Sequence, residues 1–84
     1  MTFILTNKII NAIIRMYELG EMTKKNSGIF GFYSVMWYLR DNGIAMVKEV
    51  NPTKDKVWIL TEKGRKIAEK LIEIKKILGE YHEG

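Results

Sequence analysis

The spacing of the apolar residues changes along this chain of 84 residues, and these changes restrict the fold more than any single motif. Apolar side chains recur at helical spacing in residues 6–19 and 27–42, with a period of two in 44–50 and 57–60, and at helical spacing again in 61–81. Helices followed by a β-hairpin and a last helix predict an α+β fold that is mostly helical. So short a chain holds one hydrophobic core, so we expect a single domain over residues 1–84.

Residue types that favour helix ends mark the limits of these segments. Thr6 and Thr61 are placed to cap the first and the last helix. Thr23 suits the start of one short turn, and Ser27 the start of a longer helix. The Asn-Gly pair at 42–43 is typical of a left-handed helix end, so we expect this longer helix to cover residues 27–42.

The last helix has two kinds of surface. Its apolar residues follow spacings of four, three, four and three, whereas its other side mixes Lys and Glu at intervals of three and four. A mixed charged side is typical of a solvated surface, and two heptads are too few for a stable coiled coil alone. The apolar stripe consists of Ile67, Leu71, Ile74, Leu78 and Tyr81.

The composition argues against several classes of protein. There is no Cys, so a disulfide framework and a thiolate metal site are excluded. The single His, His82, lies in a tail that we expect to fray, and no pair of carboxylates is placed in an apparent cleft. We therefore expect no enzyme activity, no cofactor and no metal. The longest apolar run, Val35 to Leu39, is too short for a membrane span, so we expect a cytoplasmic, intracellular protein.

The positive charge is modest, and its location is more informative than its size. Fourteen Lys and Arg residues against ten Asp and Glu residues give a net charge of +4, which permits binding to a polyanion. The segments "TKKN" at 23–26 and "PTKDK" at 52–56 are basic and lie outside the periodic segments. Both are expected at tips or turns on the surface.

From Leu39 onward, "LRDNGIAMVKEVNPTKDKVWILTEKGRKIAEKL" resembles the winged helix-turn-helix transcription regulators of the MarR and PadR kind, especially small archaeal and archaeal-virus members. The most specific pieces are "LRDNGI", "VKEVNPTKDKVWILT" and "LTEKGRKIA". The resemblance implies a winged helix in the order helix, short turn, helix, two-stranded wing hairpin and helix. The interval from Gly20 to Gly43 is short for this family, which reduces the second helix to about one turn.

The resemblance also implies a mode of DNA binding. In such proteins the helix before the wing enters the major groove, and the wing tip lies along phosphates or in the minor groove. Residues 27–42 are then the recognition helix, and Lys54 and Lys56 are wing residues that face phosphates. The alternative for these two lysines is a solvated turn. The candidate DNA-binding residues are Lys24, Lys25, Tyr33, Ser34, Arg40, Lys54 and Lys56.

The predicted recognition helix has an outer side with few groups that read bases. Base edges are most often read by Arg, Lys, Asn and Gln. When Phe32, Met36 and Leu39 face the core, the outer side holds no Lys, Asn or Gln. Affinity is therefore expected from phosphate contacts, and sequence preference from DNA shape, Ser34 and the tyrosines. The outer side consists of Phe30, Ser34, Trp37 and Asp41, with Tyr33 and Tyr38 at its borders.

Phe30 and Trp37 leave two functional hypotheses open. An outward Phe and Trp suit an interface between proteins, so we expect a homodimer that uses them. Candidate additions to this interface are "MTFIL" at residues 1–5 and the terminal helix. A plain core role for Trp37 is the alternative. The favoured function is a dimeric transcription regulator that binds double-stranded DNA. The runner-up is a winged-helix protein-interaction module that uses Phe30 and Trp37.

Overall fold

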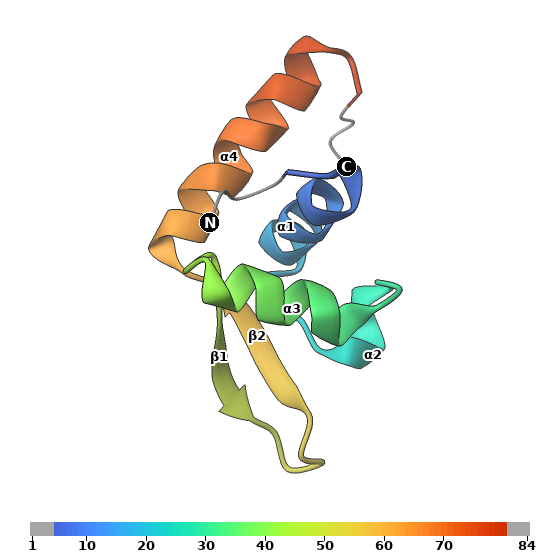
Figure 1. Ribbon diagram of the computed structural model, residues 1–84, viewed down its shortest axis with the longest axis vertical. Helices are drawn as coiled ribbons and strands as arrows, with labels where there is room; N and C mark the ends of the chain where they lie inside the picture. The colour runs from blue at the N-terminus through green and yellow to red at the C-terminus, as the bar shows by residue number, and fades with distance from the viewer. Residues whose placement is uncertain (1–4, 81–84) are drawn as a thin grey trace.

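The computed structural model describes residues 5–80, which form four helices and one antiparallel hairpin (Figure 1). The predicted α+β class is confirmed. Helix α3 lies across the middle of the molecule, with α1 and α4 on one side of it and the hairpin extending from the other. The elements are α1 (Asn7–Leu19), α2 (Lys24–Ser27), α3 (Phe32–Asp41), β1 (Ala45–Val50), β2 (Lys56–Leu60) and α4 (Glu62–Ile77).

Three predicted threonine caps are confirmed. The Thr6 hydroxyl accepts a hydrogen bond from the Ile9 N–H at 3.3 Å, and the Thr61 hydroxyl accepts one from the Gly64 N–H at 3.0 Å. Thr23 caps α2, which has four residues and matches the expected single turn. Each cap satisfies a backbone donor that the helix itself leaves free. These local bonds fix where the helices start.

The prediction that Ser27 caps a helix over residues 27–42 is wrong. Ser27 is the buried last residue of α2, and α3 begins at Phe32. The Ser27 hydroxyl donates to the Lys24 carbonyl at 2.9 Å and accepts from the Ile29 N–H at 3.2 Å. It closes the turn after α2 and does not serve as the N-cap of α3.

Two glycines explain why the helix starts late. Gly28 and Gly31 have φ angles of 65° and 71°, in the left-handed region that interrupts an α-helix. Phe30 lies between them in a turn before α3. Phe30 therefore does not lie on the outer side of the helix with Trp37, as the sequence interpretation had it.

The end of α3 follows the prediction. Gly43 has a φ of 71°, and its N–H donates to the Arg40 carbonyl at 3.0 Å. The Ile44 N–H donates to the Leu39 carbonyl at 2.9 Å. These two bonds form a Schellman motif, which turns the chain directly from α3 into β1.

A single residue pairs with the hairpin as a third strand. Met22, in the connection between α1 and α2, exchanges two backbone hydrogen bonds with Trp58 of β2, at 2.9 and 2.8 Å. Met22 thus acts as a one-residue strand beside β2. On the other side, β1 pairs with β2 from Ala45↔Leu60 to Val50↔Lys56, with a bulge at Lys48.

The core lies where α1, α3, α4 and the hairpin meet. Trp58 is fully buried and Leu60 is 7% exposed, so alternate residues of β2 face the core. The inner residues of α3 are also those expected from its spacing. The core residues of α3 are Phe32, Val35, Met36 and Leu39.

Helix α4 buries a different stripe from the one predicted. Its buried residues are Gly64, Ala68 and Ile72, spaced four apart, and the lack of a side chain at Gly64 allows close approach to Ile44. A Cβ built on Gly64 would lie 2.1 Å from the Ile44 carbonyl oxygen. Of the predicted stripe, Ile67 and Leu71 pack at the edge of the core, Ile74 and Leu78 are exposed, and Tyr81 lies outside the described residues.

Candidate nucleic-acid interface

One flank of α3 brings together basic and aromatic side chains. Tyr33, Trp37 and Arg40 are spaced four and three residues apart, so they share one side of the helix. Lys24 of α2 and Lys56 of β2 lie over the rings of this flank. We call these five residues (Lys24, Tyr33, Trp37, Arg40 and Lys56) the cation–aromatic row.

The Trp37 ring is the centre of the row. The Arg40 guanidinium carbon is 4.1 Å from the ring centroid, and the Lys56 Nζ is 4.9 Å from it. Trp58 packs edge-on against the Trp37 ring, with the two centroids 5.9 Å apart. A cation within about 6 Å of an indole face is attracted by the ring quadrupole. Trp37 therefore holds two positive charges between α3 and the hairpin.

Tyr33 holds a third cation at the other end of the row. The Lys24 Nζ lies 5.3 Å from the Tyr33 centroid, and Tyr33 packs edge-on against the buried Phe32 at 5.4 Å. Because α2 is a single capped turn, Lys24 at its first position is held close to the start of α3. The positive charges therefore extend along the length of this flank.

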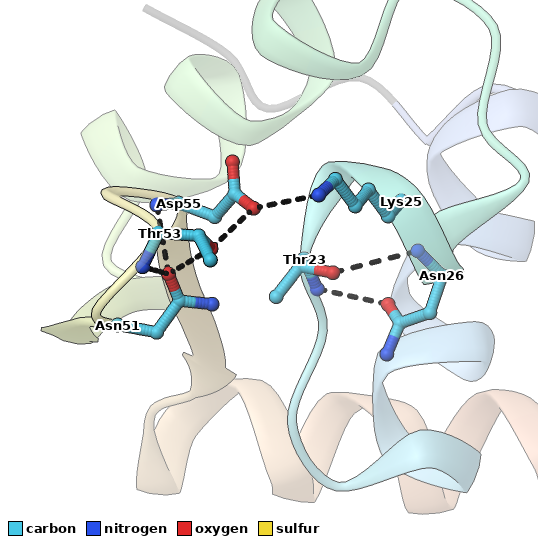
Figure 2. A network of polar contacts seen from close by, with 6 residues as sticks. All are labelled: Thr23, Lys25, Asn26, Asn51, Thr53 and Asp55. Atoms are coloured by element: carbon cyan, nitrogen blue, oxygen red, sulfur yellow. Dashed lines mark hydrogen bonds and ion pairs between the residues drawn. The ribbon is translucent and has the colours of Figure 1, made fainter.

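The hairpin tip is built by one asparagine side chain (Figure 2). The Asn51 Oδ1 accepts hydrogen bonds from the Thr53 N–H at 3.2 Å, the Thr53 hydroxyl at 2.8 Å and the Asp55 N–H at 2.9 Å. The Lys54 N–H donates to the Asn51 carbonyl at 2.8 Å. Lys54 itself has a φ of 67°, in the left-handed region that a lysine rarely adopts. The tip is thus an organised turn that carries an exposed lysine.

An ion pair joins the hairpin tip to α2. The Lys25 Nζ lies 3.5 Å from the Asp55 carboxylate, and Lys25 remains 78% exposed at its side chain (Figure 2). Exposed pairs of this kind contribute little to stability. Their effect on charge is larger, because Asp55 offsets part of the positive field of Lys25 and Lys54. A polyanion that binds here competes with Asp55 for Lys25.

The structure thus gathers the predicted DNA-binding residues with one exception, Ser34. Ser34 is exposed on the other flank of α3, beside Thr6 and Tyr38 in a shallow hollow. Phe30 and Trp37 have different surroundings, because the Lys8 Nζ of α1 lies over the Phe30 ring at 5.6 Å. The remaining predicted residues lie along the row or at the hairpin tip: Lys24, Lys25, Tyr33, Arg40, Lys54 and Lys56.

Two features of the site were not found from the sequence. The stacking of Lys56 on Trp37 depends on the hairpin register, for which the chain gives no local signal. The stacking of Arg40 on Trp37 does have a local signal in the sequence, because residues three apart on a helix are neighbours. Lys48 of β1 is not part of the row, because it pairs with Glu21, and this hydrogen bond raises the pKa of Lys48.

A second hollow lies behind the hairpin, away from the row. It has a volume of about 480 Å³ and is lined by α1, β2 and the start of α4, including Tyr17 and Arg65. The Tyr17 hydroxyl donates to the Glu69 carboxylate at 3.2 Å, which raises the pKa of Tyr17. Lys48 and Glu21 close its rim.

Residues 5–80 offer neither a metal site nor a membrane-spanning helix. No group of three or more His, Cys, Asp or Glu side chains is close enough to hold a metal ion. Within the same residues, the helices are all too short or too polar to cross a bilayer. His82 lies outside the described part of the chain.

Comparison of the chain with protein-family models, curated proteins and solved structures finds no match. The likeness to winged helix-turn-helix regulators therefore stays a prediction, supported by the quoted segments and by the order of the elements.

Proposed function

We propose that this protein is a winged-helix protein that binds double-stranded DNA and regulates transcription. The order of helices and hairpin supports this fold, and so does Met22, which takes the place of a third strand between the first two helices. In this proposal α3 is the recognition helix and the hairpin is the wing. Residues 32–41, and not 27–42, are then the part of the chain that enters the major groove.

The cation–aromatic row is the observation that carries the proposal. Three cations are held on the flank of α3 that faces the hairpin, and Lys25 and Lys54 add two more beside them. Five phosphate contacts per protomer predict a slope of about −4 to −5 when the logarithm of the association constant is plotted against that of salt concentration. Phosphate binding would therefore supply most of the affinity.

Sequence preference has a weaker basis in this proposal. The exposed residues of α3 include Ser34 and Asp41 but no Asn or Gln, so few groups are suited to pair with base edges. Tyr33 and Trp37 offer ring surface to thymine methyl groups or sugars. Arg40 is the one guanidinium on this flank, and its ring contact competes with bidentate reading of guanine. DNA shape and deformability would thus decide much of the preference.

The test is fluorescence anisotropy of a mixed-sequence duplex at several salt concentrations. We expect the wild type to bind tightly at low salt and more weakly as salt rises. The double variant Lys54→Glu/Lys56→Glu should lose binding by at least about a hundredfold, because two attractive charges become repulsive. The matched variant Arg65→Glu/Lys66→Glu changes the same charge on α4 and should bind within a few-fold of wild type. Equal losses in both variants would contradict a wing contact.

A second candidate function is favoured by the exposure of Phe30. Its side chain is 91% exposed, the highest value among the large apolar residues in the described range. It borders a hollow of about 650 Å³ whose lining includes Lys8, Asn11 and Arg15 but no acidic residue. An acidic protein partner would suit such a hollow. Phe30→Ala should leave DNA binding unchanged, so a loss of DNA affinity in this variant would argue against a separate partner site.

A further inference from the structure

The hollow beside Phe30 lies between two walls of different chemistry. Lys8, Asn11 and Arg15 are spaced three and four residues apart, so they line the hollow from one side of α1. The opposite wall is the connection between α2 and α3, including Gly28 and Phe30. The volume of about 650 Å³ lies in the range of small-molecule sites. The hollow is therefore large enough for a small ligand.

The two cations on the α1 wall are not neutralised by the protein. None of the ion pairs within residues 5–80 involves Lys8 or Arg15. The Arg15 guanidinium donates to the Ser27 carbonyl at 3.3 Å and to the Asn26 carbonyl at 3.2 Å. These bonds hold the guanidinium in place and leave its other N–H groups for a ligand. Such a group suits an anion whose oxygens can accept from it, a phosphate or a carboxylate.

An aromatic ring lies at the other end of the hollow. Phe30 is 91% exposed, and the Lys8 Nζ is 5.6 Å from its ring centroid. An exposed ring beside a cation is a stacking surface for a nucleobase. From Lys8 to Arg15, α1 rises by about 10 Å. The Phe30 ring and the Arg15 guanidinium therefore mark two separate ends of one hollow.

We propose that this hollow binds a nucleoside monophosphate, with the base on the Phe30 ring and the phosphate at Asn11 and Arg15. In a nucleotide a sugar separates the flat ring from the phosphate, so one molecule can reach both ends of the hollow. A ring that carries a carboxylate directly would reach only one end. An acidic segment of a protein would use the charges of α1 and leave the Phe30 ring without a role. Because every base has a stacking face, the site is expected to accept more than one base.

This site is separate from the proposed DNA contact. It shares no residue with the cation–aromatic row, whose cations lie over Tyr33 and Trp37. The inference therefore goes beyond DNA binding and does not rest on it.

The experiment is an NMR titration of the isotope-labelled full chain with adenosine monophosphate, without DNA. We expect a dissociation constant on the order of 100 µM, because the hollow is open to solvent on one side. The largest shift changes should fall on the amides of residues 8–15 and 27–30. Adenosine lacks the phosphate and inorganic phosphate lacks the base, so each should bind at least about tenfold more weakly.

Exposed positions allow each end of the site to be altered separately, and the NMR spectrum of each variant shows whether it is folded. Phe30→Leu keeps an apolar side chain without the ring and should weaken binding about tenfold, whereas Phe30→Tyr keeps the ring and should bind within about twofold of wild type. Asn11→Asp puts a negative charge beside the phosphate and should weaken binding at least about tenfold at low salt. Asn11→Ala removes only the amide and should cost about threefold. The row variant Arg40→Gln/Lys56→Gln should bind adenosine monophosphate as the wild type does.

Several results would overturn the proposal. One is the absence of shift changes at about 10 mM adenosine monophosphate, which is far above the expected dissociation constant. Equal affinity for the nucleotide and for inorganic phosphate would indicate a general anion site. Loss of binding in Arg40→Gln/Lys56→Gln would place the nucleotide on the cation–aromatic row. Binding of an acidic peptide, with none of the nucleotide, would assign the hollow to a protein partner.

Discussion

Two exposed apolar surfaces of this protein differ in what surrounds them. On α3, the Trp37 ring is 36% exposed and carries Arg40 and Lys56 over it. On α4, Ile77 is 78% exposed beside other aliphatic side chains. An aromatic surface that holds cations presents positive charge in fixed positions, which suits a polyanion. An aliphatic surface without such charges gains free energy mainly by leaving water, which suits another apolar surface.

The first half of α4 is attached through the close contact of Gly64 with Ile44, and Gly64→Ala tests that attachment. In most helices this change stabilises by up to about 1 kcal/mol. Here the new Cβ would lie 2.1 Å from the Ile44 carbonyl oxygen, so backbone must move. We expect a loss of at least about 3 kcal/mol in the free energy of unfolding, measured with urea. Gly79→Ala, where nothing lies within 4 Å, should cost about 1 kcal/mol because its φ is 74°. Equal losses would show that α4 is not closely packed at Gly64.

Truncation of each exposed surface should separate the two regions. Trp37→Ala removes the edge-on contact with Trp58 and the platform for two cations, so we expect a loss of about 2 kcal/mol in unfolding free energy and weaker DNA binding. Ile77→Ala should change the stability of the dilute monomer by less than about 0.5 kcal/mol and leave DNA binding to a single short site unchanged. Urea unfolding and anisotropy measure both. A larger stability loss for Ile77→Ala would mean that its surface is covered within the monomer.

The smallest expected effect sharpens the role of charge at the hairpin tip. Asp55→Asn keeps the shape of the side chain but removes the negative charge that faces Lys25. DNA affinity should rise about threefold at low salt, while unfolding free energy changes by less than about 0.5 kcal/mol. Anisotropy titrations of wild type and variant give the ratio directly. Reduced affinity would indicate that Asp55 organises the tip for binding instead of opposing it.

The elements that could be predicted from the sequence are those set by local bonds. Thr6, Thr23 and Thr61 cap helices by bonds to residues three positions ahead, and the Asn42-Gly43 pair ends α3 within one turn. The start of α3 was predicted wrongly for a local reason as well. Ile29 and Phe32 keep the helical spacing of the apolar residues of α3, but Gly28 and Gly31 have left-handed φ angles and interrupt the helical backbone before Phe32.

Features that depend on distant parts of the chain could not be predicted in this way. The apolar stripe of α4 is regular in spacing, yet the buried stripe is Gly64, Ala68 and Ile72, and the close approach to the Ile44 backbone requires glycine at position 64. Similarly, Lys56 reaches Trp37 only because β2 pairs with β1 in its observed register. Spacing within one helix contains neither piece of information.

The most direct test of the central claim is the salt dependence of DNA binding for the wild type and for Arg40→Gln/Lys56→Gln. The claim predicts that removing these two cations lowers the magnitude of the logarithmic salt slope by about two, because two phosphate contacts are lost. The matched variant Arg65→Gln/Lys66→Gln should keep the wild-type slope. An unchanged slope in Arg40→Gln/Lys56→Gln would contradict the claim that the cations on Trp37 contact DNA.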